Sequence, residues 1–323
     1  FIEAGADFEK ETGRFLLEWF DEKGNLELIT TGKKGTPKHI RIKKQAMIKS
    51  ALATGDCFNL KSGDRALHCL PTKYIAGKMM LVRGLILGLE MDFVAPSSNP
   101  LENNEKEYDF VALVPLQVQN SISELQKVKK VIIGGAKINE SLRKELLKLS
   151  AQVYETYGMT ETITHIAAKK IGEKAFTVFP DIKIAQDERE CLVISASQIS
   201  DEKVVTNDIV RLVSEKEFIL LARIDNVINS GGIKLIPEQI EEKLSDKIAT
   251  RFFVAGIPDE ALGEKVSLVI ESENQIFDES IFEVLDKYEK PKEIIFVPNF
   301  RETESGKVMR KETVNAFIIK KTP

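Results

Sequence analysis

Residues 131–149, VIIGGAKINESLRKELLKL, contain the strand–turn–helix unit on which the fold assignment depends. The β-branched run at 131–133 predicts a strand, and the two glycines after it predict a turn. Asn139 then provides an N-cap residue, and leucines at positions 142, 146, 147 and 149 follow at helical spacing. A strand that passes through a turn into an amphipathic helix is the repeating unit of layered α/β domains.

The same alternation continues on both sides of this unit. Strands are expected at residues 26–31, 92–95, 110–114, 152–154, 191–195 and 218–221, and a helix at 43–53. We expect the strands at 92–95 and 110–114 to be buried. After residue 223 the pattern changes to helices at 238–244 and 279–287 and strands at 251–256, 266–271 and 293–297. The predicted fold class is α/β, with a large layered α/β domain at 1–224 and a smaller, mobile α+β domain at 225–323.

Composition limits the function classes. The chain has 323 residues, 43% of them hydrophobic, and a net charge of −4, which gives no overall attraction to nucleic acid or an anionic membrane. Its three cysteines form no CxxC pair, so we expect free thiols in a reducing compartment. The most apolar stretch, 75–89, contains Lys78 and Arg83 and is shorter than a membrane span. The start of the chain lacks a signal-peptide pattern, so we expect a cytoplasmic protein, with homo-oligomerisation left open.

Five segments carry side chains typical of phosphate chemistry, and the first is a glycine- and lysine-rich loop after the first predicted strand. Its backbone N–H groups and lysines can face phosphates. The segment lacks the Gly-Lys-Ser/Thr ending of a Walker A loop, and a solvated charged turn is the alternative. Its candidate phosphate-binding residues are Thr30, Thr31, Gly32, Lys33, Lys34, Gly35, Thr36 and Lys38.

The second and third segments follow later strands. Tyr157, Gly158, Thr160 and Glu161 combine an aromatic ring, a flexible residue, a hydroxyl and a carboxylate, which suits a nucleotide with Mg²⁺. A polar loop at a strand end is the alternative. Asp208, which we expect in a loop, could accept both hydroxyls of a ribose, although an Asp that follows Asn is also a common turn residue.

The fourth and fifth segments belong to the second predicted domain. Residues 223–241 run from Arg223 through a glycine pair to Pro237, a suitable first residue of a helix. Residues 304–310 contain Lys307, which could bring a cation to a reacting phosphate or carboxylate, although a single lysine is usually solvated surface.

In this order, the five segments resemble the adenylate-forming superfamily of acyl-CoA synthetases, luciferases and peptide-synthetase adenylation domains, over about residues 26–311. Residues 69–80 and 157–165 are similar to 2-succinylbenzoate–CoA ligases of menaquinone synthesis, particularly a short form. The resemblance implies a two-step ligase in which ATP, with Mg²⁺, converts an acid to its acyl-adenylate and coenzyme A then takes the acyl group. Alternatives are another aryl or fatty acid, a carrier-protein thiol as acceptor, and a degenerate member that only binds nucleotide or acyl-CoA.

The resemblance also implies roles for single residues. The first loop would hold the β- and γ-phosphates, and Glu161 would hold Mg²⁺. The residues that would contact the rest of the nucleotide are Gly134, Gly135 and Ala136 around adenine, Tyr157 on its face, Thr160 at the α-phosphate, and Asp208 with Arg223 at the ribose. Lys307 would bridge the acid and the α-phosphate and stabilise charge as the carboxylate attacks.

The second half-reaction involves a hinge. Asp225 matches the hinge of the family, about which the small domain would rotate, removing Lys307 and bringing Gly231 and Gly232 to the pantetheine channel. Asn207 stands where the family usually has Gly, and we expect this replacement to be harmless because Asn tolerates positive φ better than most residues.

The acid would lie near Tyr74, at the aromatic gate of the family. The candidates for the second carboxylate of 2-succinylbenzoate are Lys73, Lys78, Thr164 and His165, with a packed or surface role as the alternative for His165.

Overall fold

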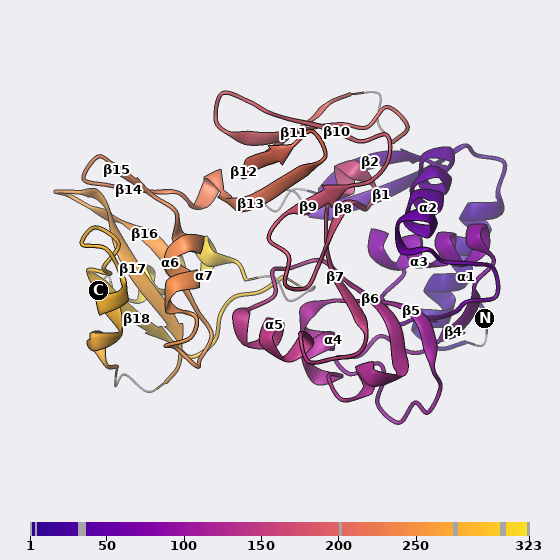
Figure 1. The fold of residues 1–323 in the computed structure, drawn as a ribbon, viewed down its shortest axis with the longest axis horizontal. Helices are drawn as coiled ribbons and strands as arrows, with labels where there is room; N and C mark the ends of the chain where they lie inside the picture. Colours follow the sequence, from indigo (N-terminus) through magenta and orange to yellow (C-terminus); the bar gives the residue numbers. More distant parts are fainter. Residues whose placement is uncertain are drawn as a thin grey trace.

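The computed structural model describes residues 2–3, 5–31, 37–199, 202–273, 277–303 and 308–321. Within these residues the strands form sheets of two, eleven and five strands. Figure 1 shows the two larger sheets in separate parts of the molecule, joined through the short helix η3 (Ile224–Asn226). The predicted α/β class is confirmed.

The eleven-stranded sheet has a parallel part and an antiparallel part. The parallel part has the order β7-β6-β5-β3-β4, and the antiparallel strands β8, β9, β13, β12, β11 and β10 continue from β7. The strands are β3 (Arg65–His68), β4 (Glu90–Phe93), β5 (Tyr108–Leu113), β6 (Val128–Ile133), β7 (Gln152–Gly158), β8 (His165–Lys170), β9 (Phe176–Val178), β10 (Lys183–Gln186), β11 (Cys191–Ser195), β12 (Val204–Ser214) and β13 (Glu217–Arg223). The second halves of β5 and β6 are covered on their two faces, and their apolar residues are continuous there, at 110–113 and 131–133.

Helices cover this sheet and enclose two apolar cores, one on each face. Asn139 caps α5 as expected, since its Oδ1 accepts a hydrogen bond of 2.8 Å from the Leu142 amide. A third core lies beneath α1 and the hairpin of β1 and β2. These elements are α1 (Asp7–Phe20), β1 (Asn25–Thr31), β2 (Pro37–Lys43), α2 (Lys44–Phe58), α3 (Ile75–Leu87), α4 (Pro115–Asn120), η1 (Glu124–Lys127) and α5 (Glu140–Leu146).

The small part has its own sheet and its own apolar core. Gly231 and Gly232 form the two-residue turn between β14 and β15, with φ of +57° and +83°, a region that favours glycine. The elements are β14 (Ile228–Ser230), β15 (Ile233–Leu235), α6 (Pro237–Leu244), β16 (Phe252–Asp259), β17 (Gly263–Glu271), η4 (Glu279–Val284), β18 (Glu293–Val297) and α7 (Arg310–Lys321). The large sheet ends at Arg223 and the small one begins at Ile228, and the boundary at 224/225 stays a prediction.

Two expected elements differ from the structure. The expected buried strand at 92–95 is β4, which lies at the sheet edge and is partly exposed, with Asp92 in an ion pair with Lys106. The expected helix at 279–287 is the short 3-10 helix η4. Its buried residue Phe282 and Leu285, which is buried directly after η4, are three positions apart, which matches the period of a 3-10 helix rather than that of an α-helix. No helix in the described part of the chain is long and apolar enough to cross a membrane.

Candidate active site

Two of the candidate segments lie at one edge of the large sheet because the strands that lead to them, β6 and β7, are parallel. Consecutive strands run outward from β3 to β4, and the chain then returns to place β5 on the other side of β3. In open parallel sheets, ligands bind beyond the carboxyl ends of the strands, beside such a reversal. The loop at Gly134 follows β6 and the segment at Thr160 follows β7, so the structure brings these two predicted segments to the same edge.

Gly158 is required by a close approach of two backbones. A Cβ atom at this position would lie 2.2 Å from the Thr164 carbonyl oxygen and 2.5 Å from the His165 Cα. The sequence predicted a loop here, but Tyr157 and Gly158 lie within β7, which continues past the expected 152–154. The chain then turns sharply through η2 (Thr160–Thr162), and Ile163, although β-branched, has φ of +67°. Such backbone strain is typical of functional sites.

Asp208 is the centre of a hydrogen-bonded cluster. It lies within β12 rather than in the expected loop, and it is 6% exposed. Tyr157 Oη donates to its Oδ2 at 2.6 Å, and Arg223 Nη1 donates to its Oδ1 at 2.9 Å. Arg223 Nη2 also reaches Asp225 Oδ2 at 3.1 Å. The structure therefore links Tyr157, Asp208, Arg223 and Asp225, which are separated in the sequence, and each Asp208 oxygen keeps a second lone pair for a ribose hydroxyl.

Tyr157 is buried more deeply than the expected role at adenine suggested. Its ring packs edge-on against Phe218 at 5.1 Å between centroids and lies 5.9 Å from Phe176. Burial and the neighbouring Asp208 carboxylate raise the pKa of its hydroxyl, so this group remains a hydrogen-bond donor. Its packing on adenine stays a prediction.

Arg83 is a candidate residue that the sequence interpretation missed. It lies in the apolar helix α3 and is 2% exposed. Its Nε donates to Thr54 Oγ1 at 3.3 Å and its Nη2 to Thr164 Oγ1 at 3.2 Å. Burial lowers its pKa to about 9, and no ion pair joins it to a carboxylate of the described residues. The signal for it in the sequence is a single arginine in the apolar stretch 75–89.

His165 is neutral and packed beside Arg83. Its Nε2 lies 3.0 Å from Thr54 Oγ1, whose own proton points to the Ser50 carbonyl. Since Thr54 already donates elsewhere, Nε2 must carry the imidazole proton. Burial, and then the charge of Arg83, lower the pKa of His165 well below its ordinary value. Its ring also meets Phe179 edge-on at 5.3 Å.

The other acid-site candidates are dispersed. Tyr74 lies at the N-cap position of α3, and Lys73 Nζ lies 4.9 Å from its ring centroid. Lys78 turns toward α1, where its ammonium lies 4.7 Å from the ring centroid of Phe15, and burial lowers its pKa. Of the four groups considered for the second carboxylate, Thr164 accepts a hydrogen bond from Arg83, and His165 shares Thr54 with it.

Several predicted residues are not placed against the site. Thr30 and Thr31 lie in β1 and Lys38 lies in β2, whereas Gly32, Lys33, Lys34, Gly35, Thr36 and Lys307 lie outside the described residues. The glycine turn of β14 and β15 contacts Leu262 of the small part, through a bond of 2.8 Å from the Gly231 amide. The roles given to these residues stay predictions.

The described residues contain no cluster of three or more His, Cys, Asp or Glu side chains suited to a metal. Glu161 is exposed in η2, at the edge where phosphates are expected. This arrangement fits Mg²⁺, which is commonly held by one or two carboxylates together with substrate phosphates rather than by a protein cage.

Comparison with known proteins identifies the family of this chain. Residues 29–191, half of the chain, match the family described as AMP-binding enzyme. The chain belongs to the AMP-binding enzyme family. Its predicted class, an AMP-forming acid–thiol ligase, is confirmed.

Three known proteins are similar to this chain in sequence or structure. A structure of an acyl-CoA synthetase (AMP-forming)/AMP-acid ligase II-like protein from Dyadobacter fermentans is 35% identical, with 96% of this chain and 94% of that one covered and a TM-score of 0.65. The 2-succinylbenzoate–CoA ligase of Listeria monocytogenes is 26% identical, with 91% of this chain and 71% of that protein covered. The O-succinylbenzoate coenzyme A synthetase of Bacillus subtilis, solved with ATP and magnesium, has a TM-score of 0.77 at 19% identity over 89% of this chain and 69% of its own, and this likeness supports the fold.

Proposed function

We propose that this enzyme is a 2-succinylbenzoate–CoA ligase of menaquinone synthesis. In the first step, a carboxylate oxygen of the acid attacks the α-phosphorus of ATP and pyrophosphate leaves. In the second step, the thiol of coenzyme A attacks the acyl carbon and AMP leaves. The named Listeria relative supports this substrate, and the observation that carries the proposal is the buried guanidinium of Arg83.

Arg83 provides what a dicarboxylate requires. One carboxylate of 2-succinylbenzoate reacts, and the other must be removed from water at a cost unless a cation receives it. An arginine stays charged and presents a fork of N–H donors that matches a carboxylate. Arg83 pairs with no carboxylate of the described residues, and its Nη2 donates to Thr164, directly before β8. An anionic ligand would therefore complete its surroundings.

The remaining residues would bind and orient ATP. Asp208 and Arg223 would hold the ribose, while the loop after β6, with Gly134, Gly135 and Ala136, would face adenine. Thr160 would bond the α-phosphate, and Glu161 would hold Mg²⁺, which neutralises phosphate charge when bound. The loop that contains Lys33 and Lys34 would hold the outer phosphates, and Lys307 would stabilise the negative charge shared by the acid and the α-phosphate.

The test is pyrophosphate release from ATP and Mg²⁺, with 2-succinylbenzoate, benzoate and a medium-chain fatty acid compared, each with and without coenzyme A. Release with 2-succinylbenzoate alone, and its CoA thioester when CoA is added, is the expected result. Release with another acid would keep the ligase and replace the substrate. No release with any acid would support a member that binds nucleotide without catalysis.

A variant pair tests Arg83 directly. Arg83→Met keeps much of the buried volume without the charge, and we expect kcat/KM for 2-succinylbenzoate to fall about 10- to 100-fold, the range for a hydrogen bond to a charged group. Benzoate, which lacks the second carboxylate, should lose less than about threefold if any activity with it is measurable. Arg83→Lys keeps the charge but not the fork, so it should lie between the two. Equal losses for the two acids would remove Arg83 from substrate recognition.

Two wider expectations belong to this proposal. The three cysteines, Cys57, Cys69 and Cys191, are free, which suits a reducing compartment and a cytoplasmic location. The partners would be the small molecules of the reaction, and homo-oligomerisation stays a prediction.

A further inference from the structure

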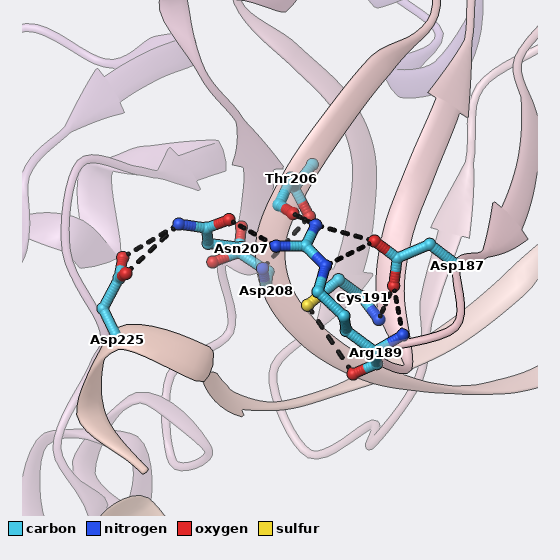
Figure 2. A network of polar contacts seen from close by, with 7 residues as sticks. All are labelled: Asp187, Arg189, Cys191, Thr206, Asn207, Asp208 and Asp225. Atoms are coloured by element: carbon cyan, nitrogen blue, oxygen red, sulfur yellow. Dashed lines mark hydrogen bonds and ion pairs between the residues drawn. The ribbon is translucent and has the colours of Figure 1, made fainter.

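The side-chain contacts of Asn207, directly before Asp208, explain why this position has an asparagine, and its backbone conformation does not. We expected the replacement of Gly to be harmless because Asn tolerates positive φ, but Asn207 is not among the residues with positive φ, so positive φ is not the reason for an asparagine here. It lies within β12, where many residues would suit the backbone. Figure 2 shows its carboxamide between Arg189 on one side and Asp225 on the other. The reason for an asparagine therefore lies in these two contacts.

The carboxamide bridges the large sheet to the segment that joins the two parts. Its Nδ2 lies 3.2 Å from each carboxylate oxygen of Asp225, which belongs to η3. Its Oδ1 accepts from Arg189 Nη1 at 3.4 Å. The cation and the carboxylate fix the orientation of the amide, since the reversed amide would set its oxygen against the carboxylate.

Arg189 is itself held in place (Figure 2). Its Nε and Nη2 donate to Asp187 Oδ2 at 2.8 and 2.6 Å, and its Nη2 also reaches the Thr206 carbonyl at 3.2 Å. The other oxygen of Asp187 accepts from the amides of Arg189 and Cys191, each at 2.9 Å. The turn between β10 and β11 thus presents a pre-oriented guanidinium to Asn207.

The joining segment is tied differently on its other side. Asn226 donates to Glu238 of α6 at 2.7 Å, and these two residues belong to the small part. A rotation that carries the Asp225 side chain with the small part would preserve that bond but would separate Asn207 from Asp225. Arg223 Nη2 also holds Asp225 from the end of β13, at 3.1 Å. A further polar contact between the parts, Lys144 with Asp246 at 2.6 Å, is between side chains that are 52% and 60% exposed, where an ion pair contributes little.

We propose that Asn207, oriented by Arg189, is a positioning residue that holds Asp225 and stabilises the present arrangement of the two domains. The inference rests on the proposed function, because a two-step reaction at one site uses more than one domain arrangement. In this chain the equilibrium between arrangements is set in part by one carboxamide, beside the aspartate proposed to bind the ribose.

The test measures the domain arrangement of the whole chain without substrates. Spin labels are attached through Leu52→Cys and Tyr288→Cys, two exposed positions in the separate parts, in a Cys57→Ser background that removes the exposed native thiol. Their distance distribution gives the ratio of the present arrangement to others. We expect Asn207→Ala to lower this ratio about tenfold, near the low end for a hydrogen bond to a charged group because Asp225 is 41% exposed. Lys144→Ala, the control, should lower it threefold or less, roughly the range of a surface ion pair.

Asn207→Asp, which has the same size, places two carboxylates together and should shift the distances further than Asn207→Ala. Unchanged distributions in these two variants would overturn the proposal. Pyrophosphate release and thioester formation from premade adenylate are then measured separately. If the Asn207 variants shift the distribution and the unaltered protein releases pyrophosphate with no acid, the role of Asn207 stands and the ligase is refuted. If the unaltered protein is an active ligase and the Asn207 variants leave the distances unchanged, the ligase stands and the role of Asn207 is refuted. In an active ligase, the ratio of the two half-reaction rates should change, while a merely structural role would lower the two rates alike.

Discussion

Substitution of Gly158 by Ala should disable the site without unfolding the protein. The new methyl carbon would lie 2.2 Å from the Thr164 carbonyl oxygen, and ordinary contact begins at 3.4 Å, so the two backbones must separate by about 1.2 Å. The obstacle is backbone, which cannot rotate away as a side chain could. This separation falls between β7, which leads to Thr160 and Glu161, and β8, which begins at His165.

Its effect on the rate follows from this displacement. A misplacement of about 1 Å can cost on the order of 10²-fold in rate, and added volume at a packed position typically costs about 1–3 kcal/mol of stability. We therefore expect kcat/KM for pyrophosphate release to fall roughly 100-fold. The thermal midpoint should fall while the unfolding transition remains cooperative.

The matched control is Gly24→Ala, because a Cβ at Gly24 meets nothing within 4 Å and the φ of Gly24 lies outside the left-handed region. Its rate and thermal midpoint should stay at those of the unaltered enzyme. A Gly158→Ala enzyme with kcat/KM within about threefold of the unaltered enzyme would refute the reasoning, since it would show that the turn absorbs the displacement.

Two further predictions concern stability. Tyr157→Phe removes the 2.6 Å bond to Asp208 and should lower the free energy of unfolding by about 1.5–3 kcal/mol, seen as a lower urea midpoint at unchanged slope. Its control, Tyr154→Phe, loses only an exposed 3.3 Å bond and should change the free energy of unfolding by less than about 1 kcal/mol, so equal effects would contradict the buried role of Tyr157. Burial and the charge of Arg83 lower the pKa of His165 in the folded state. Below the ordinary histidine pKa of about 6.5, the unfolded chain therefore binds this proton before the folded protein does. The free energy of unfolding then falls as pH decreases, by up to about 1.4 kcal/mol per pH unit. His165→Gln should reduce this slope between pH 6.5 and 5.5 and leave the part due to His68, whose pKa burial also lowers; an unchanged slope would mean that His165 is protonated in the folded protein.

Local patterns predicted the elements that depend on nearby residues. The β-branched run at 131–133, the N-cap Asn139 and the first helical residue Pro237 lie where expected, because strand, cap and turn preferences act within a few residues. The failures were at positions whose surroundings come from distant segments. The strand near Asp92 became an edge strand because of its place in the sheet order, which its own residues do not specify.

The sequence by itself determined the family and the α/β class and provided candidate residues for a nucleotide site, because motif order and periodicity are properties of the chain. Only the tertiary structure decided which side chains meet. Asp208 gained Tyr157 and Arg223 as partners across three strands, Arg83 was buried without a carboxylate partner among the described residues, and Asn207 reached Asp225. These contacts join residues between 15 and 51 positions apart in the chain, and the energy of a buried charge or hydrogen bond depends on surroundings that exist only after folding.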